Sequence, residues 1–289
     1  MKNILRKIFY ATQRILLMIS SLRKIYRRGG YATFNIAYVN NGETLRGKKI
    51  LITGGSAGIG FCIARKCIQE GAEVVITGRD ESKLLDASKK ISSPSLKTLV
   101  WDVGQIAALD QGIATTIELL GGEIDILVNN AGIIDGIDFP NVPEEVWDKI
   151  YAINSKGVFF ITQALCKGWM QNINGSLKKV INISSQGGFV GASYPYRMTK
   201  WDIAGLTQGL GMKLAPHGII VNGIAPGIIV TAMQPDLLNQ KENVYHPLTP
   251  LQRYALPEEI AELAAFLMGD SANFIVGQTI VCDGGFSLK

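Results

Sequence analysis

The chain has 289 residues, of which 47% are hydrophobic and 18% are charged. This composition is typical of a globular protein with a large core and excludes a disordered or collagen-like chain. No run of residues approaches the roughly 18 consecutive apolar residues that a transmembrane helix needs. The spacing of the four cysteines matches neither a zinc site nor a thioredoxin-like motif. We therefore expect a reduced, cytoplasmic protein without a metal centre.

The net charge of +5 is unevenly distributed along the chain. Residues 1–42 carry eight Lys or Arg and no acidic residue, whereas the remainder carries 21 basic and 24 acidic residues. Because a mildly acidic body does not attract nucleic acid, we expect no nucleic-acid partner. The basic character belongs to the N-terminal segment, which needs a separate explanation.

Residues 3–28 place apolar side chains on one helical face and basic side chains mostly on the other, although Tyr10 and Leu17 break the pattern. Gly29 and Gly30 are expected to end this helix. A basic amphipathic helix without acids is typical of a peripheral contact with an anionic membrane, here its inner face. The alternatives are a helix packed on its own domain or on a partner subunit, and a cleavable targeting peptide.

From residue 44 onward, short apolar runs alternate with longer amphipathic ones. We predict strands at 50–52, 73–77, 98–101, 124–128, 180–183, 219–221 and 279–281, and helices at 59–70, 82–90, 109–120, 143–168, 196–215 and 257–267. Nearly continuous apolarity is typical of strands that are covered on both faces. The alternation predicts an α/β fold with one doubly wound parallel sheet at 44–289, preceded by a helical extension at 1–43.

A glycine-rich segment follows the first predicted strand and opens the next helix. Gly54, Gly58 and Gly60 would let the backbone turn sharply and approach a pyrophosphate, which the free N–H groups of the helix would then bind. The spacing is Gly-x-x-x-Gly-x-Gly and differs from the commoner Gly-x-Gly-x-x-Gly dinucleotide fingerprint. A tight turn without a ligand is the alternative.

This spacing resembles the short-chain dehydrogenase/reductase family, including its members similar to 3-oxoacyl-carrier-protein reductase. Further motifs of the family follow in order: Asn129-Asn130-Ala131-Gly132, Tyr196-x-x-x-Lys200, Pro226-Gly227 with Thr231, and Asp283-Gly284-Gly285. The resemblance covers residues 45–289 and implies a Rossmann-like fold, a nicotinamide cofactor, a small-molecule substrate and a homo-oligomer, either a tetramer or a dimer. It assigns to the cofactor site Gly54, Ser56, Gly58, Ile59, Gly60, Arg79, Asp102, Val103, Asn129, Ala131, Gly132, Tyr196, Lys200, Pro226, Gly227, Ile229 and Thr231.

The end of the second predicted strand distinguishes the two nicotinamide cofactors. An acidic residue there would bind the ribose hydroxyls and repel a 2′-phosphate. By resemblance, Gly78 takes the place of that acid, and Arg79 can bind a phosphate through two N–H groups. We therefore expect NADP(H) to be preferred over NAD(H). A solvated Arg79 paired with Asp80, and an Asp102 that stabilises its loop instead of binding adenine, are the alternatives.

Reduction of a ketone also requires a proton donor. Tyr196 and Lys200 are one helical turn apart, and the lysine charge is expected to lower the pKa of the tyrosine. The resemblance makes Tyr196 the general acid in reduction and the general base in oxidation, and it lets Lys200 bind the nicotinamide ribose. Ser185 would bind the substrate carbonyl, and Asn154 would hold a water that links Lys200 to solvent.

Ser185 lies 11 residues before Tyr196, which is two residues fewer than the family pattern. We therefore expect the connecting loop to change the shape of the substrate pocket. A serine that only binds the backbone is the alternative, above all for Ser184.

The resemblance implies an NADP(H)-dependent oxidoreductase that interconverts a ketone and a secondary alcohol by hydride transfer. A 3-oxoacyl-carrier-protein reductase is one alternative, although Met212-Lys213 replaces the Arg-Glu pair of such members. A reductase of a sugar, polyol or lipid-like ketone is another. The intact Ser185, Tyr196 and Lys200 argue against a non-catalytic scaffold that only binds the cofactor.

Overall fold

The computed structural model describes residues 12–13, 15–20, 22–23, 42–171, 176–229 and 244–288. Its centre is one sheet of seven parallel strands in the order β3-β2-β1-β4-β5-β6-β7. The strands are β1 (Lys49–Ile52), β2 (Glu73–Gly78), β3 (Leu96–Val100), β4 (Ile126–Asn129), β5 (Lys178–Ile183), β6 (Ile219–Pro226) and β7 (Thr279–Cys282). Each overlaps one predicted strand, and β6 extends further than predicted.

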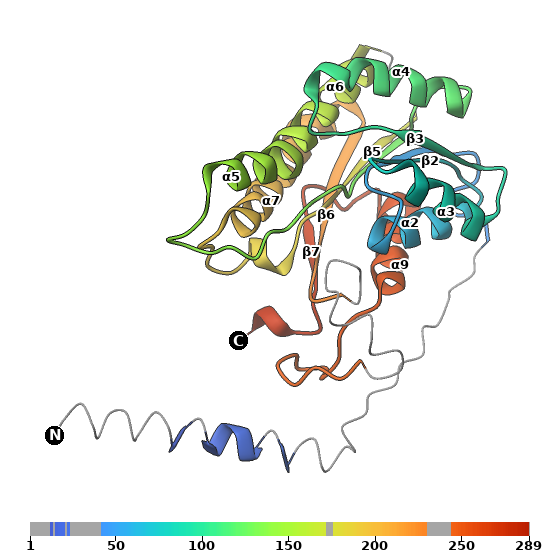
Figure 1. The fold of residues 1–289 in the computed structure, drawn as a ribbon. Helices are drawn as coiled ribbons and strands as arrows, with labels where there is room; N and C mark the ends of the chain where they lie inside the picture. The colour runs from blue at the N-terminus through green and yellow to red at the C-terminus, as the bar shows by residue number, and fades with distance from the viewer. Residues whose placement is uncertain are drawn as a thin grey trace.

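Helices cover both faces of the sheet, which confirms the predicted doubly wound α/β fold (Figure 1). One layer contains α2 (Gly58–Gln69), α3 (Glu81–Ile91) and α9 (Pro257–Met268). The other contains α4 (Leu109–Leu120), α5 (Glu144–Tyr151), α6 (Val158–Gln171) and α7 (Pro195–Leu214). Short 3-10 helices lie at Ile106–Ala108, Gln186–Gly188, Ala215–His217, Asp270–Ala272 and Phe286–Leu288.

The central strands are buried on both faces, as their continuous apolar sequences predict. Ile50 and Ile52 face the core under α2 and α9, whereas Leu51 between them faces the core under α4 and α6. All three side chains are fully buried. Successive side chains of a strand point to opposite faces, so a strand between two helical layers needs apolar residues at every position.

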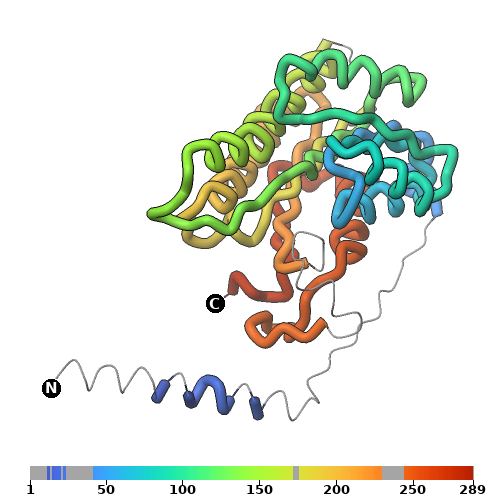
Figure 2. Tube along the Cα trace, viewed as in Figure 1, coloured from blue at the N-terminus to red at the C-terminus, as the bar shows by residue number. Residues whose placement is uncertain are grey.

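The predicted helix at 143–168 is interrupted by a wider segment. Residues Ala152–Gly157 form a π-helix between α5 and α6, and the three pieces run on as one rod beside α7 (Figures 1 and 2). π segments often occur at functional sites because the extra residue in the turn redirects a side chain. Here the segment contains Asn154.

The N-terminal extension is described only in part. The described residues between 12 and 23 are helical, and their apolar side chains are exposed. The rest of the predicted helix at 3–28 lies outside the described residues. Among the described residues, no helix is long and apolar enough to cross a membrane.

Candidate active site

A cleft of about 650 Å³ lies at the carboxyl ends of the strands. The sheet order places β1 beside β4, so the chain turns to opposite sides after these two strands, and such a switch point is where doubly wound sheets bind ligands. The lining residues come from segments 54–59, 77–83, 101–103, 130–134, 153, 183–190, 194–200, 226–229 and 286. We call this site the cofactor cleft.

The glycine motif forms the floor of the cofactor cleft. Gly54 has a φ of +67°, and a Cβ there would lie 2.7 Å from the Ala131 Cα. A Cβ on Gly60 would lie 2.4 Å from the amide nitrogen of Asn130. Both positions therefore require glycine, for conformation at Gly54 and for close packing at both.

Hydrogen bonds of Asn130 and Thr53 connect the glycine motif to the residues that follow β4. The Asn130 side chain donates to the carbonyl oxygens of Thr53 and Gly54, at 3.0 and 2.8 Å. The Thr53 hydroxyl accepts from the backbone N–H groups of Asn130 and Ala131, both at 3.1 Å. Sequence reasoning did not assign these two side chains a role, although Asn130 lies inside a motif that it identified.

The helix that follows the glycine motif leaves its N-terminus available to an anion. Helix α2 starts after Ala57, which has no side chain to bind the first N–H groups, and its first turn carries no acid. Gly54, Ser56, Gly58 and Ile59 line the cleft at this end. Free N–H groups at the positive end of a helix, above a floor that admits no Cβ, fit the pyrophosphate of a dinucleotide.

The end of the cleft beside β2 and β3, where the sequence predicts the adenosine, contains Arg79, Lys83, Asp80 and Asp102; we call it the adenosine end. Asp80 accepts from the Lys83 backbone N–H at 3.1 Å, and its carboxylate lies 3.7 Å from the Lys83 ammonium. Among the described residues, Arg79 has no ion-pair partner. The pairing of Asp80 with Arg79 is therefore not seen, although Arg79 is exposed, as the alternative of a solvated side chain expects.

Asp102 and Val103 line the cleft, as predicted. Asp102 also accepts from the Gly104 backbone N–H at 3.0 Å, so it stabilises its own loop. The alternative role of Asp102, the stabilisation of its own loop, is thus present in the structure.

Asn129 is not among the residues that line the described cleft, and its side chain points away from it. Its side chain is buried, and its amide nitrogen donates to the Thr162 hydroxyl and to Asn182 Oδ1, both at 2.9 Å. Asn182 in turn donates to the Thr207 hydroxyl at 2.9 Å. Asn129 therefore belongs to a buried polar chain that ties β4 and β5 to α6 and α7.

The carboxyl end of β6 brings Pro226, Gly227 and Ile229 to the cleft. A Cβ on Gly227 would lie 2.7 Å from the Asp283 Cα, so the Pro-Gly and Asp-Gly-Gly motifs pack directly together. The Asp283 carboxylate accepts from the backbone N–H groups of Gly285 and Ser287, at 2.8 and 2.7 Å. The predicted cofactor residue Thr231 lies outside the described residues.

Ser185, Tyr196 and Lys200 meet in the cleft despite the short loop between them. Ser185 and Tyr196 both line this end of the cleft, and Ser185 is close enough to the Tyr196 hydroxyl to oppose a rise in its pKa. The Lys200 ammonium lies 5.5 Å from the Tyr196 ring centroid and donates to the Ile183 carbonyl at 2.9 Å. The neighbouring Ser184 has the backbone role that was its alternative, because its hydroxyl donates to the Lys200 carbonyl at 2.7 Å.

The electrostatics of this group differ from the sequence prediction. Burial lowers the pKa of Lys200 to about 8, and burial also raises the pKa of Tyr196 while Ser185 opposes that rise. The Lys200 ammonium contacts a carbonyl and lies over the tyrosine ring instead of reaching its hydroxyl. The cost of removing both groups from water therefore exceeds their mutual effect, and the expected lowering of the tyrosine pKa is absent.

Asn154 reaches the exit of β4 from the π segment. Its amide nitrogen donates to the Ile133 carbonyl at 2.9 Å and to the Thr199 hydroxyl at 3.2 Å, and its oxygen accepts from the Ile133 N–H at 2.9 Å. A Cβ on Gly132 would lie 3.5 Å from the Asn154 oxygen and 3.7 Å from the Lys200 ammonium. Gly132 thus keeps open the space that these two groups share.

Among the residues that the structure describes, no group of three or more His, Cys, Asp or Glu side chains could hold a metal ion. The polar groups of the cleft are instead those of a dinucleotide site with a Ser-Tyr-Lys group beside it.

The comparisons with known proteins agree with this architecture. The family model described as enoyl-(acyl carrier protein) reductase matches residues 54–287. The chain is 33% identical to gluconate 5-dehydrogenase of Gluconobacter oxydans over 250 residues, covering 85% of this chain and 97% of the relative. It is 35% identical over 253 residues to dehydrogenase/reductase SDR family member 4 of Oryctolagus cuniculus, covering 86% and 96%.

Solved structures lead to the same family. The 3-ketoacyl-(acyl-carrier-protein) reductase of Brucella melitensis, complexed with NADH, has a TM-score of 0.78 and 30% identity, covering 84% of this chain and 99% of that one. The Pseudomonas aeruginosa RhlG/NADP complex has a TM-score of 0.77 and 32% identity, covering 84% and 97%. The chain belongs to the short-chain dehydrogenase/reductase family. It is a nicotinamide-dependent oxidoreductase that acts on CH–OH and C=O groups.

Proposed function

We propose that the chain is an NADP(H)-preferring reductase in which Ser185, Tyr196 and Lys200 carry out the interconversion of a ketone and a secondary alcohol. The observation that carries the proposal is that Ser185 and Tyr196 line the cofactor cleft together with the buried Lys200, whose ammonium lies 5.5 Å from the Tyr196 ring centroid. The preference for NADP(H) rests on Arg79, which lines the adenosine end of the cleft without a described ion-pair partner.

The residues of the cleft divide the work of the reaction. When bound, the nicotinamide supplies or accepts the hydride. Ser185 donates a hydrogen bond to the substrate carbonyl oxygen, and the Tyr196 hydroxyl gives its proton to that oxygen as negative charge develops on it. Lys200, which is buried and positively charged near neutral pH, stabilises the tyrosinate that remains. Asn154 holds the Ile133 backbone through two hydrogen bonds and borders the space at Gly132. Through this space a proton can return to Tyr196 after each turnover.

The test is oxidation of NADPH with a panel of ketones, followed at the absorbance of the reduced cofactor. The panel includes 5-ketogluconate, a 3-oxoacyl thioester and a neutral cyclic ketone, because the similar proteins include gluconate 5-dehydrogenase and 3-oxoacyl-carrier-protein reductases. Tyr196→Phe should lower kcat by on the order of 100-fold or more and leave the Kd of NADPH unchanged, since only the proton donor is lost. Retention of most activity by this variant would contradict the assignment.

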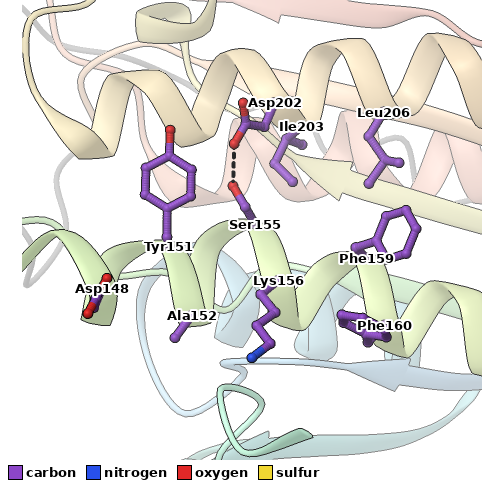
Figure 3. A pocket seen from close by; sticks show the side chains of 10 residues that line it. All are labelled: Asp148, Tyr151, Ala152, Ser155, Lys156, Phe159, Phe160, Asp202, Ile203 and Leu206. Carbon is purple, nitrogen blue, oxygen red and sulfur yellow. Dashed lines mark hydrogen bonds between the residues drawn. The ribbon is translucent and has the colours of Figure 1, made fainter.

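We further propose that the face formed by α5, the π segment, α6 and α7 binds a second copy of the chain. A groove of about 710 Å³ lies there, and Figure 3 shows Tyr151 and Ser155 directed toward α7, with Ser155 bonded to Asp202 at 2.7 Å. Phe159 and Trp201 on the same helices are 42% and 49% exposed. An apolar face of this kind supports a dimer or tetramer. Phe159→Glu should lower the molar mass measured by light scattering, and an unchanged mass would refute this interface.

The N-terminal segment 1–43 is proposed to contact an anionic membrane surface while the body 44–289 remains cytoplasmic. Its described apolar side chains, including Ile15, Leu17 and Leu22, are 45–67% exposed. Leu17 lies off the predicted apolar face, so the exposed apolar surface is broader than a narrow stripe. Full-length protein should pellet with anionic vesicles at low salt and be released at high salt, whereas a chain truncated at Glu43 should stay in solution. Dissociation of the oligomer on truncation, without vesicle binding, would instead assign the helix to assembly.

A further inference from the structure

Arg197 directly follows Tyr196 in α7, and its side chain lines the same end of the cofactor cleft as Ser185 and Tyr196. Its guanidinium lies 5.4 Å from the Tyr194 ring centroid and donates one hydrogen bond, to the Gly191 carbonyl at 3.1 Å. A guanidinium has five N–H donors in a planar fork that suits an oxoanion. Arg197 therefore has donor capacity left at the place where a substrate would enter.

The charges around Arg197 favour an anion. Among the described residues, no carboxylate lies within ion-pair distance of Arg197, whereas Lys83 at the other end of the cleft lies beside Asp80. The two acidic residues among the described lining, Asp80 and Asp102, follow β2 and β3 and belong to the adenosine end. The substrate end thus combines Arg197 and Lys200 with uncharged neighbours.

A second polar group faces the same space. The side-chain oxygen of Gln186, which also lines the cleft, is buried and has no hydrogen-bond partner among the described residues. A buried acceptor without a partner is unfavourable, and a hydroxyl group of a ligand would satisfy it. The side chains next to the Ser-Tyr pair are therefore suited to a polar, negatively charged substrate.

We propose that Arg197 binds a carboxylate of the substrate, so that the site takes hydroxylated keto acids in preference to neutral ketones. This inference rests on the proposed function, because it places the reacting carbonyl at Ser185 and Tyr196. One residue further along the helix from Tyr196, Arg197 holds the acid group while the tyrosine reaches the carbonyl oxygen. A bidentate pair of this type fixes the orientation of the substrate and also favours a substrate that carries a negative charge.

Arg197 also holds the loop before α7, and the experiment must separate the two roles. Trp201 provides the matched control, since its indole N–H donates to the Val190 carbonyl of the same loop at 2.9 Å but carries no charge. Arg197→Gln removes the charge, Arg197→Lys keeps it without the fork, and Trp201→Phe removes a loop hydrogen bond while it keeps an aromatic side chain on the proposed oligomer face.

The probes are 5-ketogluconate and L-sorbose, which share one keto-hexose skeleton and differ in a terminal carboxylate or CH₂OH group. Calorimetry on the enzyme–NADP⁺ complex measures their Kd values without turnover, so the result stands even if the proposed reaction fails. The wild type should bind the keto acid at least about tenfold more tightly than the neutral sugar. Arg197→Gln should abolish that ratio, Arg197→Lys should keep part of it, and Trp201→Phe should keep it.

Three results would overturn the proposal: equal affinities for the two probes in the wild type, equal weakening of both probes by Arg197→Gln, or no detectable binding of either probe. Equal weakening that Trp201→Phe reproduces would assign Arg197 to loop positioning. In contrast, failure of the proposed function would appear as an absence of NADPH oxidation while the difference in Kd persists, so the two failures are distinguishable.

Discussion

Asn154→Asp tests the buried bridge between the π segment and the exit of β4. The side chain is 1% exposed and makes three hydrogen bonds, two as a donor and one as an acceptor. An aspartate has the same shape and can still accept from the Ile133 N–H. It cannot donate to the Ile133 carbonyl or to the Thr199 hydroxyl, and it brings a negative charge against that carbonyl.

The magnitude follows from these contacts. Leaving a buried acceptor without its donor costs about 1–3 kcal/mol, and two donated bonds are lost. With the uncompensated charge, the free energy of unfolding at pH 7 should fall by about 3–5 kcal/mol, which is a large part of the stability of an ordinary domain. A protonated carboxyl group can donate again, so the folded state gains a proton that the unfolded chain does not hold. The loss should therefore shrink as the pH falls toward 5.

The assay is urea unfolding followed by tryptophan fluorescence at pH 5, 6, 7 and 8, without cofactor and at one protein concentration. Asn154→Ala is the control, because it removes the same donors but has no group to protonate. Its loss should be similar at pH 7 and should not recover at low pH. A loss below about 1 kcal/mol for Asn154→Asp at pH 7, or the same pH dependence in both variants, would refute the bridge.

Three further predictions use other parts of the molecule. Arg79→Ala should raise the Kd of NADPH by about tenfold or more and leave the Kd of NADH nearly unchanged, as measured by cofactor fluorescence; equal weakening of both would contradict the role of Arg79. Burial lowers the pKa of Lys200 and of Lys179 to about 8 from 10.5. The unfolded chain therefore binds more protons above pH 8, and between pH 8 and 9 each lysine adds about 1 kcal/mol to the free energy of unfolding. Lys200→Met and Lys179→Met should each remove one such increment relative to wild type, and an unaltered pH dependence would contradict these pKa shifts. Burial raises the pKa of Cys62 and of Cys166 to about 12, so iodoacetamide at pH 8 should leave both unlabelled in the native protein and label all four cysteines in guanidinium; native labelling would mean that these thiols are accessible.

The sequence predicted the elements that local patterns determine. All seven strands were found because each contains a short, mostly apolar run, and the glycine motif was found because its positions need either positive φ or close packing. The sequence could not show that Asn129 and Asn130 have different roles. They are identical neighbours at the end of β4, and only the three-dimensional structure shows that Asn129 points into the buried layer while Asn130 points toward the glycine motif.

Electrostatics were the second point that sequence could not settle. The helical spacing correctly placed Tyr196 and Lys200 on one face, but the sign of a pKa shift depends on burial and on where the ammonium lies. Lys200 donates to the Ile183 carbonyl, which belongs to a strand 17 residues earlier in the chain. No local pattern encodes that contact.

The loop between Ser185 and Tyr196 shows how a departure from a family pattern can leave the chemistry in place. A loop two residues short would be expected to pull Ser185 away from Tyr196, yet both side chains line the same cleft beside Lys200. The backbone of this loop is held by two side chains of α7, through Arg197 to Gly191 and Trp201 to Val190. Both residues lie on the same helix as Tyr196, so the loop and the proton donor are fixed to one rigid element. The shortening therefore acts on the mouth of the cleft, which Arg197 lines, and under our proposal this is the part of the site that selects the substrate.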